Sequence, residues 1–252
     1  MNLSSPSPAQ IEAIERATIA TVAHDCFEVI GPWVLGLRPG SIGRAHSAAP
    51  LAHTLVRDEG LIARIEAAYR ARDMSPVFRL PDVDGLASVA EALTERGYGP
   101  QQPTLVMTAD LDRAASFAEP AGASQLERPD EDWAAVFLGE GFDPQDGAHR
   151  VAVLSNSPGA AFAAVRDAEG THAVGALSLA EGWASLHGMR TRRARRGEGL
   201  AGQVVACLAQ AARAKGATQI FLQVEAGNAP ARALYARAGF TPLWRYQYWR
   251  RA

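Results

Sequence analysis

Hydrophobic residues recur along the first half of the chain with spacings that alternate between those of helices and those of strands. Helical spacing marks three segments, the first through Ile11, Ile14, Ala17 and Thr18 after the Ser7-Pro8 pair, the second through Leu55, Ile62, Ile65 and Tyr69, and the third over Leu86–Arg96. Strands are predicted at Cys26–Ile30, Trp33–Leu37, Val77–Leu80 and Thr104–Thr108. Such alternation is typical of α/β or α+β layer structures.

The second half alternates in the same way. Helices are predicted around Asp132–Phe137, over Gly199–Lys215 and over Ala229–Ala238, with Asn228 as the cap of the last one. Strands are predicted at Ala161–Arg166, Ala173–Leu179, Trp183–Met189, Gln219–Glu225 and Leu243–Trp249. The fold class predicted for the whole chain is therefore α/β (α+β).

The length of 252 residues fits one large domain or two small ones, at about 150 residues per domain. The stretch 116–129, SFAEPAGASQLERP, has no periodic apolar pattern and contains two prolines, so we place a boundary there. The expected domains are residues 1–120 and 121–252. A helix end followed by Gly97-Tyr98 is echoed by a helix end followed by Gly239-Phe240, which suggests a duplicated unit, although glycine commonly ends helices.

Composition excludes several classes of protein. Twenty-five Lys and Arg against 27 Asp and Glu leave a net charge of −2, which disfavours binding of nucleic acid through a bulk positive field. The start lacks an apolar signal segment and no stretch reaches about 18 apolar residues, so we expect a cytoplasmic protein without membrane contact. Cys26 and Cys207 are far apart in sequence, which argues against a disulfide framework or a metal site, and Cys207 is expected in the core.

The segment Arg196–Gly202, RGEGLAG, follows an apolar strand and opens a helix. Glycines there let the backbone approach a ligand closely, and the free N–H groups of a helix start can hold phosphate oxygens. Five arginines lie within Arg190–Arg196 just before it. We expect Arg196 to bind an anion and the other four to be peripheral, solvated residues.

A dinucleotide-binding site is the sharpest alternative, since Gly197, Gly199 and Gly202 match GxGxxG and Glu225 ends the next strand. The arginine-rich loop replaces the tight turn of that motif, however. Too little chain follows Gly202 for the repeated strand-helix units of a doubly wound sheet.

Two signatures resemble the GNAT superfamily of N-acetyltransferases. Arg196-x-x-Gly199-x-Ala201 is similar to its coenzyme-binding motif [QR]-x-x-G-x-[GA], and the run from Asn228 through Tyr235 to Phe240 is similar to N-x-x-A-x-x-[LF]-Y-x-x-x-G-F. The resemblance is clear over about residues 130–252 and weak before, where no glycine-rich loop occurs. The chain therefore looks like a tandem GNAT protein with a degenerate N-terminal half, 1–120, and a catalytic half, 121–252.

The resemblance implies an acyl-CoA N-acyltransferase-like fold, with a mixed central sheet flanked by helices. It also implies an acetyl-CoA-dependent transferase that acetylates a primary amine of a small molecule, amino acid or peptide by direct attack. Acetyl-CoA is the implied co-substrate, without a metal, and we leave a homodimer open. The implied coenzyme-binding residues are Met189, Thr191, Arg196, Gly197, Gly199, Leu200, Ala201, Gly202 and Asn228. Tyr235 is implied as the acid that protonates the departing thiolate.

Some questions stay open at this point. His187, Glu140, Glu181 and Glu225 are candidates for the general base, and water-mediated deprotonation is an alternative to all of them. Trp33, Trp133 and Trp183 are either pocket walls or core residues. A non-catalytic acyl-CoA-binding or sensing module is the alternative to an enzyme, because it would retain the same coenzyme residues.

Overall fold

The structure is a computed structural model that describes residues 6–119, 122–139 and 143–251. Contacts divide the chain into two compact units. Unit 1 comprises Met1–Val106, Val224–Asn228 and Pro242–Ala252, and unit 2 comprises Met107–Gln223 and Ala229–Thr241. The expected boundary at 116–129 lies within unit 2, and the last strand of the chain returns to unit 1. The assignment of a degenerate half and a catalytic half stays a prediction.

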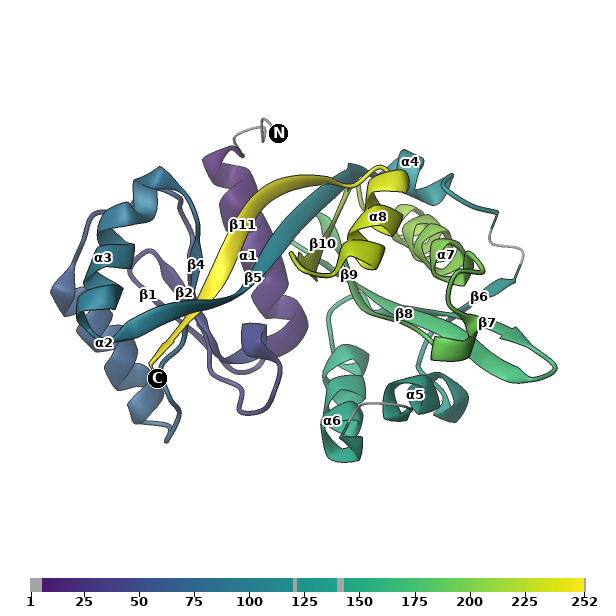
Figure 1. The fold of residues 1–252 in the computed structure, drawn as a ribbon, viewed down its shortest axis with the longest axis horizontal. Coiled ribbons are helices and arrows are strands. Elements are labelled where there is room, and N and C mark those ends of the chain that lie inside the picture. The colour runs from purple at the N-terminus through teal and green to yellow at the C-terminus, as the bar shows by residue number, and fades with distance from the viewer. Residues whose placement is uncertain (1–5, 120–121, 140–142, 252) are drawn as a thin grey trace. The chain divides into compact units, whose positions relative to one another are not determined.

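Unit 1 combines a sheet with three α-helices among its described residues (Figure 1). Its strand order is β1-β2-β3-β4-β11-β5. The helices are α1 (Pro8–Ala23), α2 (Glu59–Arg70) and α3 (Ala87–Glu95), with short 3-10 turns η1 (Gly43–His46) and η2 (Asp84–Leu86). The strands are β1 (Phe27–Ile30), β2 (Trp33–Gly36), β3 (Ala48–Pro50), β4 (Phe78–Pro81), β11 (Thr241–Arg251) and β5 (Tyr98–Asp110), whose last four residues belong to unit 2.

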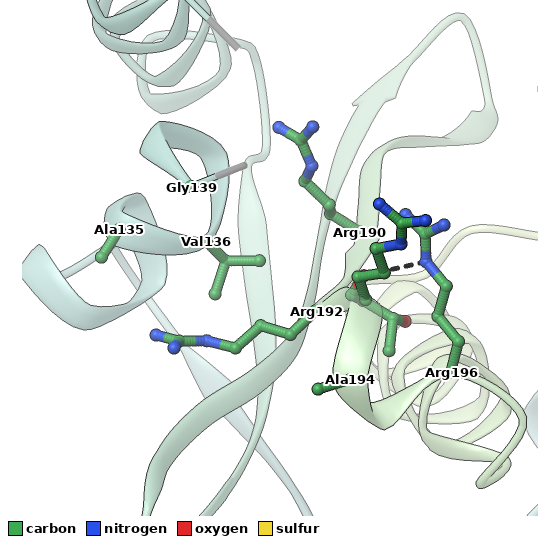
Figure 2. A pocket seen from close by; sticks show the side chains of 9 residues that line it. Ala135, Val136, Gly139, Arg190, Arg192, Ala194 and Arg196 are labelled. Atoms are coloured by element: carbon green, nitrogen blue, oxygen red, sulfur yellow. Dashed lines mark hydrogen bonds between the residues drawn. The ribbon is translucent and has the colours of Figure 1, made fainter. Parts of the chain in front are cut away.

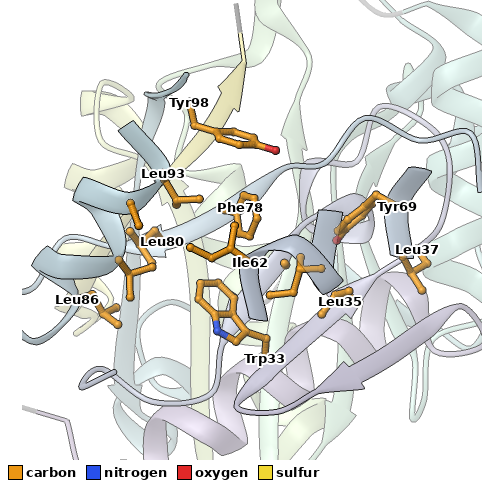
Figure 3. Packing of buried hydrophobic residues seen from close by; sticks show 14 residues of the cluster. Trp33, Leu35, Leu37, Ile62, Tyr69, Phe78, Leu80, Leu86, Leu93 and Tyr98 are labelled. Atoms are coloured by element: carbon orange, nitrogen blue, oxygen red, sulfur yellow. The ribbon is translucent and has the colours of Figure 1, made fainter. Parts of the chain in front are cut away.

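Alternation along β4 explains how both faces of this sheet are covered. Phe78 and Leu80 join the apolar cluster formed with α2 and α3, in which the ring of Phe78 meets Trp33 and Tyr98 edge to face (Figure 3). Arg79 points to the opposite face, where it forms a fully buried ion pair with Glu15 of α1.

Unit 2 contains a second sheet region with strand order β10-β9-β8-β7-β6. Its strands are β6 (Ala123–Leu126), β7 (Ala161–Asp167), β8 (Gly170–Ala180), β9 (Trp183–Thr191) and β10 (Gln219–Glu225). Its helices are α4 (Leu111–Ala115), α5 (Glu131–Leu138), α6 (Pro144–Ser155), α7 (Leu200–Ala214) and α8 (Ala229–Arg237), with the 3-10 turn η3 (Arg193–Arg195). Successive strands from β6 to β9 pair antiparallel, whereas β9 pairs with β10 in parallel. This sheet region is therefore mixed.

Helices cover the two faces of this sheet region. Trp133 of α5 lies at the centre of an apolar cluster with Phe162, Val174 and Ala176, and its indole N–H donates to the Ala163 carbonyl at 3.0 Å. On the other face Gly175 lies under α7, because a Cβ there would meet Val204 at 2.7 Å and Leu208 at 3.0 Å. The mixed sheet flanked by helices, as expected from the sequence, is thereby confirmed.

The elements expected from periodicity are present, with ends shifted by a few residues. Leu55 precedes α2 instead of lying within it. Among the strands and α-helices of the described residues, the sequence pattern does not predict β3, α4, β6 and α6. Three of them are only three to five residues long, and α6 begins in a segment whose Gly, Asp and Pro content suggests a loop.

Candidate active site

Strand β9 carries a β-bulge just before its end. His187 is opposite Ala176 and Arg190 is opposite Val174 in the ladder with β8, so Gly188 and Met189 together oppose the single residue Gly175. Gly188 adopts a φ of 58°, which favours glycine. A bulge turns the backbone groups of the extra residue out of the regular ladder, and such bulges are frequent beside active sites.

The pairing between β9 and the neighbouring strand β10 ends just before this bulge. The parallel ladder between them runs from Trp183 opposite Gln219 to Leu186 opposite Leu222, whereas β9 itself continues to Thr191 alongside β8. From His187 onward, this edge of β9 therefore offers backbone groups beyond the ladder. An extended amide chain can pair with such an edge as an added strand does.

The loop after β9 presents the start of α7 to solvent. Gly197 and Gly199 have φ values of 89° and 81°, which other residues adopt only with strain, and Gly199 is the N-cap. Among the residues that the structure describes, no side chain caps this end. The N–H groups of Gly202 and Gln203 donate to the Gly199 carbonyl at 2.9 and 3.4 Å, so those of Leu200 and Ala201 precede the first intrahelical bonds. Such free N–H groups and the helix dipole are the features that favour an anion at a helix start.

A cavity of about 520 Å³ lies beside this loop in unit 2 (Figure 2). It is lined by Ala135, Val136, Gly139, Arg190, Thr191, Arg192, Arg193, Ala194 and Arg196. Of the residues predicted to bind coenzyme, Thr191 and Arg196 are among them. The Nε of Arg196 lies 3.5 Å from the Thr191 carbonyl oxygen, which draws the side chain back over the strand end.

The arginine run divides into two groups, which its sequence alone does not reveal. Arg190, Arg192 and Arg193 line the cavity together with Arg196, and their peripheral role in anion binding stays a prediction. Arg195 instead binds acidic residues on both sides: its Nε lies 2.9 and 2.8 Å from the carboxylate oxygens of Glu198, and its Nη1 lies 3.1 Å from Asp167. The loop is thus fastened to the turn between β7 and β8.

Asp167, Glu169 and His172 lie close enough to hold a metal ion. Their groups already interact with one another and with Arg195, which is 3.7 Å from Glu169. Hydrogen bonds from His172, the Glu169 N–H and Arg195 hold the pKa of Asp167 well below its usual range. We therefore assign this cluster to an ion-pair network that fixes the loop.

Tyr235 lies on α8, whose end is a Schellman motif. The Phe240 N–H donates to the Tyr235 carbonyl and the Gly239 N–H to the Ala236 carbonyl, with Gly239 at a φ of 94°. The Tyr235 ring is buried and meets Phe240 at 6.0 Å between ring centroids. Burial raises the pKa of Tyr235 to about 12, so its phenol keeps its proton at neutral pH.

The candidates for a general base lie in different places. His187 is buried and, being opposite Ala176, faces α5 in common with Arg190. Glu181 is in the turn between β8 and β9, at the far end of β9 from the bulge. Glu225 accepts a hydrogen bond from Gln102 at 2.7 Å and belongs to unit 1, and Glu140 lies outside the described residues.

The remaining candidates can also be placed. The Met189 side chain lies on the α7 face, where a Cβ on Gly175 would come within 2.5 Å of its sulfur. Asn228 is in the turn before α8 and belongs to unit 1 by its contacts. Cys207 is buried in α7, which raises the pKa of its thiol. The three tryptophans proposed as pocket walls or core residues are buried: Trp33, Trp133 and Trp183.

Comparisons with known proteins agree with this geometry. Residues 8–249 match the model of the family described as "Probable histone acetyltransferase Rv0428c C-terminal". The chain is 26% identical over 243 residues to the uncharacterized N-acetyltransferase YobR of Bacillus subtilis (strain 168), which covers 94% of this chain and 97% of YobR.

Solved structures resemble the chain over nearly its whole length. A GCN5-related N-acetyltransferase from Kribbella flavida has a TM-score of 0.71 at 17% identity, covering 96% of this chain and 95% of that one. A tandem GNAT protein from the clavulanic acid biosynthesis pathway has a TM-score of 0.57 at 17% identity, covering 98% of each. The expected acyl-CoA N-acyltransferase-like fold is thereby confirmed. Within the described ranges, no helix is long and apolar enough to cross a membrane.

Proposed function

The chain belongs to the acetyltransferase family that its sequence matches over residues 8–249, and on this premise we propose that it transfers the acetyl group of acetyl-CoA to a primary amine of a small molecule, amino acid or peptide. One observation carries the proposal. The bulge at Gly188-Met189, the end of the β9–β10 ladder and the uncapped start of α7 occur within one short segment.

The chemistry of this segment fits the parts of acetyl-CoA. The edge of β9 from His187 to Thr191 offers backbone groups that match the amides of the pantetheine arm. The N–H groups of Leu200 and Ala201, with Arg196 beside them, suit a diphosphate. Met189, Gly197, Gly199 and Gly202 are the further coenzyme contacts in this proposal, and the contact that the family resemblance implies for Asn228 stays a prediction.

The reaction we propose is direct attack. The nitrogen of the neutral amine bonds to the thioester carbon, the bond from this carbon to sulfur breaks, and the amine proton leaves to water or to a base. The Met189 backbone N–H, which lies in the bulge, stabilises the negative charge on the carbonyl oxygen. The family resemblance gives Tyr235 the role of donating its proton to the departing thiolate, and burial keeps the phenol protonated at neutral pH.

Release of free CoA thiol from acetyl-CoA, measured against a panel of primary amines, tests this function. We expect thiol release that depends on one class of amine and the matching acetylated product by mass spectrometry. Tight acetyl-CoA binding without turnover on any amine would instead support a non-catalytic acyl-CoA-sensing module.

A further inference from the structure

The cavity beside α5 gathers positive charge beyond the anion site at α7. Four arginines line it: Arg190, Arg192, Arg193 and Arg196. In Figure 2 the Arg192 side chain extends toward Val136 of α5, whereas Arg196 lies on the opposite side of the strand end. The cations are therefore spread across the cavity and are not all directed at one diphosphate.

Arg190 faces the same side of the sheet as the α5 cluster, because its ladder partner Val174 belongs to that cluster. Burial lowers the pKa of Arg190, and the neighbouring charges of Arg196 and of Arg150 on α6 lower it further. Coulombic attraction therefore favours an anion at this end of the cavity. Arg150 itself forms an ion pair with Asp146 at 2.8 Å.

These arginines lie next to the expected reaction point. Arg190 directly follows the bulge residue Met189, and Arg192 is two residues further on, about 7 Å along an extended chain. A substrate that reaches the thioester from the α5 face would carry its substituents past Arg190 and Arg192. Ala135 and Val136 supply an apolar wall opposite them.

We propose that Arg190 and Arg192 bind a carboxylate or phosphate group of the acceptor, so that the protein acetylates amines that also carry an anionic group. This inference rests on the proposed function and narrows its substrate class. Guanidinium groups suit both oxyanions, because they donate paired hydrogen bonds in one plane. The coenzyme diphosphate stays with Arg196 and the start of α7.

The test compares matched acceptors that differ in one charge: glycine with glycinamide, glutamate with glutamine, phosphoethanolamine with ethanolamine, and glucosamine 6-phosphate with glucosamine. We expect one anionic member to have a kcat/KM about tenfold or more above that of its neutral partner. Arg190→Gln and Arg192→Gln should each raise the KM of that acceptor about tenfold and change the KM of acetyl-CoA less than twofold. Arg213→Gln, an exposed arginine near the other end of α7, is the control.

Three outcomes would overturn the inference. The first is equal use of both members in every pair. The second is an unchanged preference in both arginine variants. The third concerns the coenzyme: the Arg192→Gln variant binds acetyl-CoA tenfold more weakly than the parent does, whereas both bind 3′-dephospho-acetyl-CoA equally well. This result would assign the site to the 3′-phosphate of the coenzyme.

A calorimetric arm separates this inference from the proposed function. The CoA-saturated protein, in which the diphosphate site is filled, is titrated with the same acceptors. Binding of an anionic member that is lost in Arg190→Gln supports the anion site even if no thiol is released with any amine. Absence of both binding and an anionic preference overturns it, whatever the activity toward neutral amines.

Discussion

Arg195 holds the carboxylate of Glu198 with its Nε at 2.9 and 2.8 Å from the two oxygens, and so closes the loop between η3 and α7 on itself. The same guanidinium lies 3.1 Å from Asp167, the last residue of β7. Helix α7 begins directly after this loop, so the network fixes the position of the N–H groups of Leu200 and Ala201.

Replacing Arg195 with Gln should weaken acetyl-CoA binding without changing the fold. The loop would lose its fastening to Glu198 and Asp167, and binding would have to order it again. We expect the Kd of acetyl-CoA to rise about two- to fivefold, because exposed ion pairs contribute little free energy. Arg213→Gln, which removes an exposed pair with Asp112, should leave that Kd unchanged. Equal Kd values for both variants and the parent, measured by calorimetry, would contradict an anchoring role.

Gly199 and Gly216 offer a matched pair of backbone substitutions at the two ends of α7. Both have a positive φ, 81° and 83°, and a Cβ at either position would meet no described atom within 4 Å. Alanine should therefore strain both equally, by about 1–2 kcal/mol. Only Gly199→Ala displaces the N–H groups proposed to hold the diphosphate, so it alone should weaken acetyl-CoA binding, by about five- to thirtyfold.

Thermal unfolding and calorimetry together check this pair. A similar fall in stability for both variants, with loss of affinity in Gly199→Ala only, is the expected pattern. Equal loss of affinity in both would show that the effect arises from stability and not from the anion site.

Tyr235→Phe should lower kcat while leaving coenzyme binding intact. The ring contact with Phe240 is preserved, and only the proton donor is removed. Positioned acids contribute about 10²- to 10⁴-fold, which sets the expected loss of kcat. Tyr69→Phe is the control, because it removes a buried hydroxyl that donates to the Gly36 carbonyl at 3.0 Å in unit 1. Unchanged turnover in Tyr235→Phe would remove the residue from the mechanism.

The pH profile gives a second check on Tyr235. Its pKa is raised from 10.0 to about 12, so the folded protein keeps the phenol protonated throughout the range in which the unfolded chain begins to lose that proton. Turnover should therefore not fall between pH 7 and about pH 10. The associated stability is complete below pH 10 and is lost as the pH rises toward 12. A descending limb below pH 10 that Tyr235→Phe abolishes would contradict the raised pKa.

The buried ion pair of unit 1 should control stability and not chemistry. Both side chains are almost fully buried, and Arg79 Nη1 lies 3.1 Å from Glu15 Oε1. The Arg79 guanidinium carbon also lies 5.0 Å from the centroid of the Tyr246 ring. Glu15→Leu leaves an unpaired buried charge and should cost about 3–5 kcal/mol in denaturant unfolding. The double variant Glu15→Leu/Arg79→Met should recover most of this loss. A double variant no more stable than Glu15→Leu would contradict the pairing account.

Sequence reasoning reached much of this architecture because long periodic segments encode it directly. Helix α7 and strand β10 follow from their apolar spacing, and Gly97 and Gly239 both end helices at positive φ before a buried aromatic residue. Both glycines are thus helix ends, and a duplicated unit stays a prediction. Short elements such as β3 and α4 depend on tertiary contacts, and no local pattern distinguishes them.

The sequence predicts only part of the candidate site, because the rest depends on pairing between strands. The glycine-rich loop and Tyr235 carry sequence signatures. The bulge at Gly188-Met189 instead depends on the register with which β9 pairs with Gly175 of β8. The bulge decides which face of the sheet Arg190 occupies. The separate roles of Arg190, Arg192 and Arg195 therefore follow from register and from the position of α5, neither of which the arginine run itself contains.

Calorimetric titration with acetyl-CoA tests the central claim most directly, because it asks whether unit 2 holds the coenzyme at the start of α7. We predict one equivalent of acetyl-CoA per chain, with binding weakened by Arg196→Ala and by Gly199→Ala and unaffected by Gly216→Ala. Absence of binding, or binding that both α7 variants leave unchanged, would contradict the account.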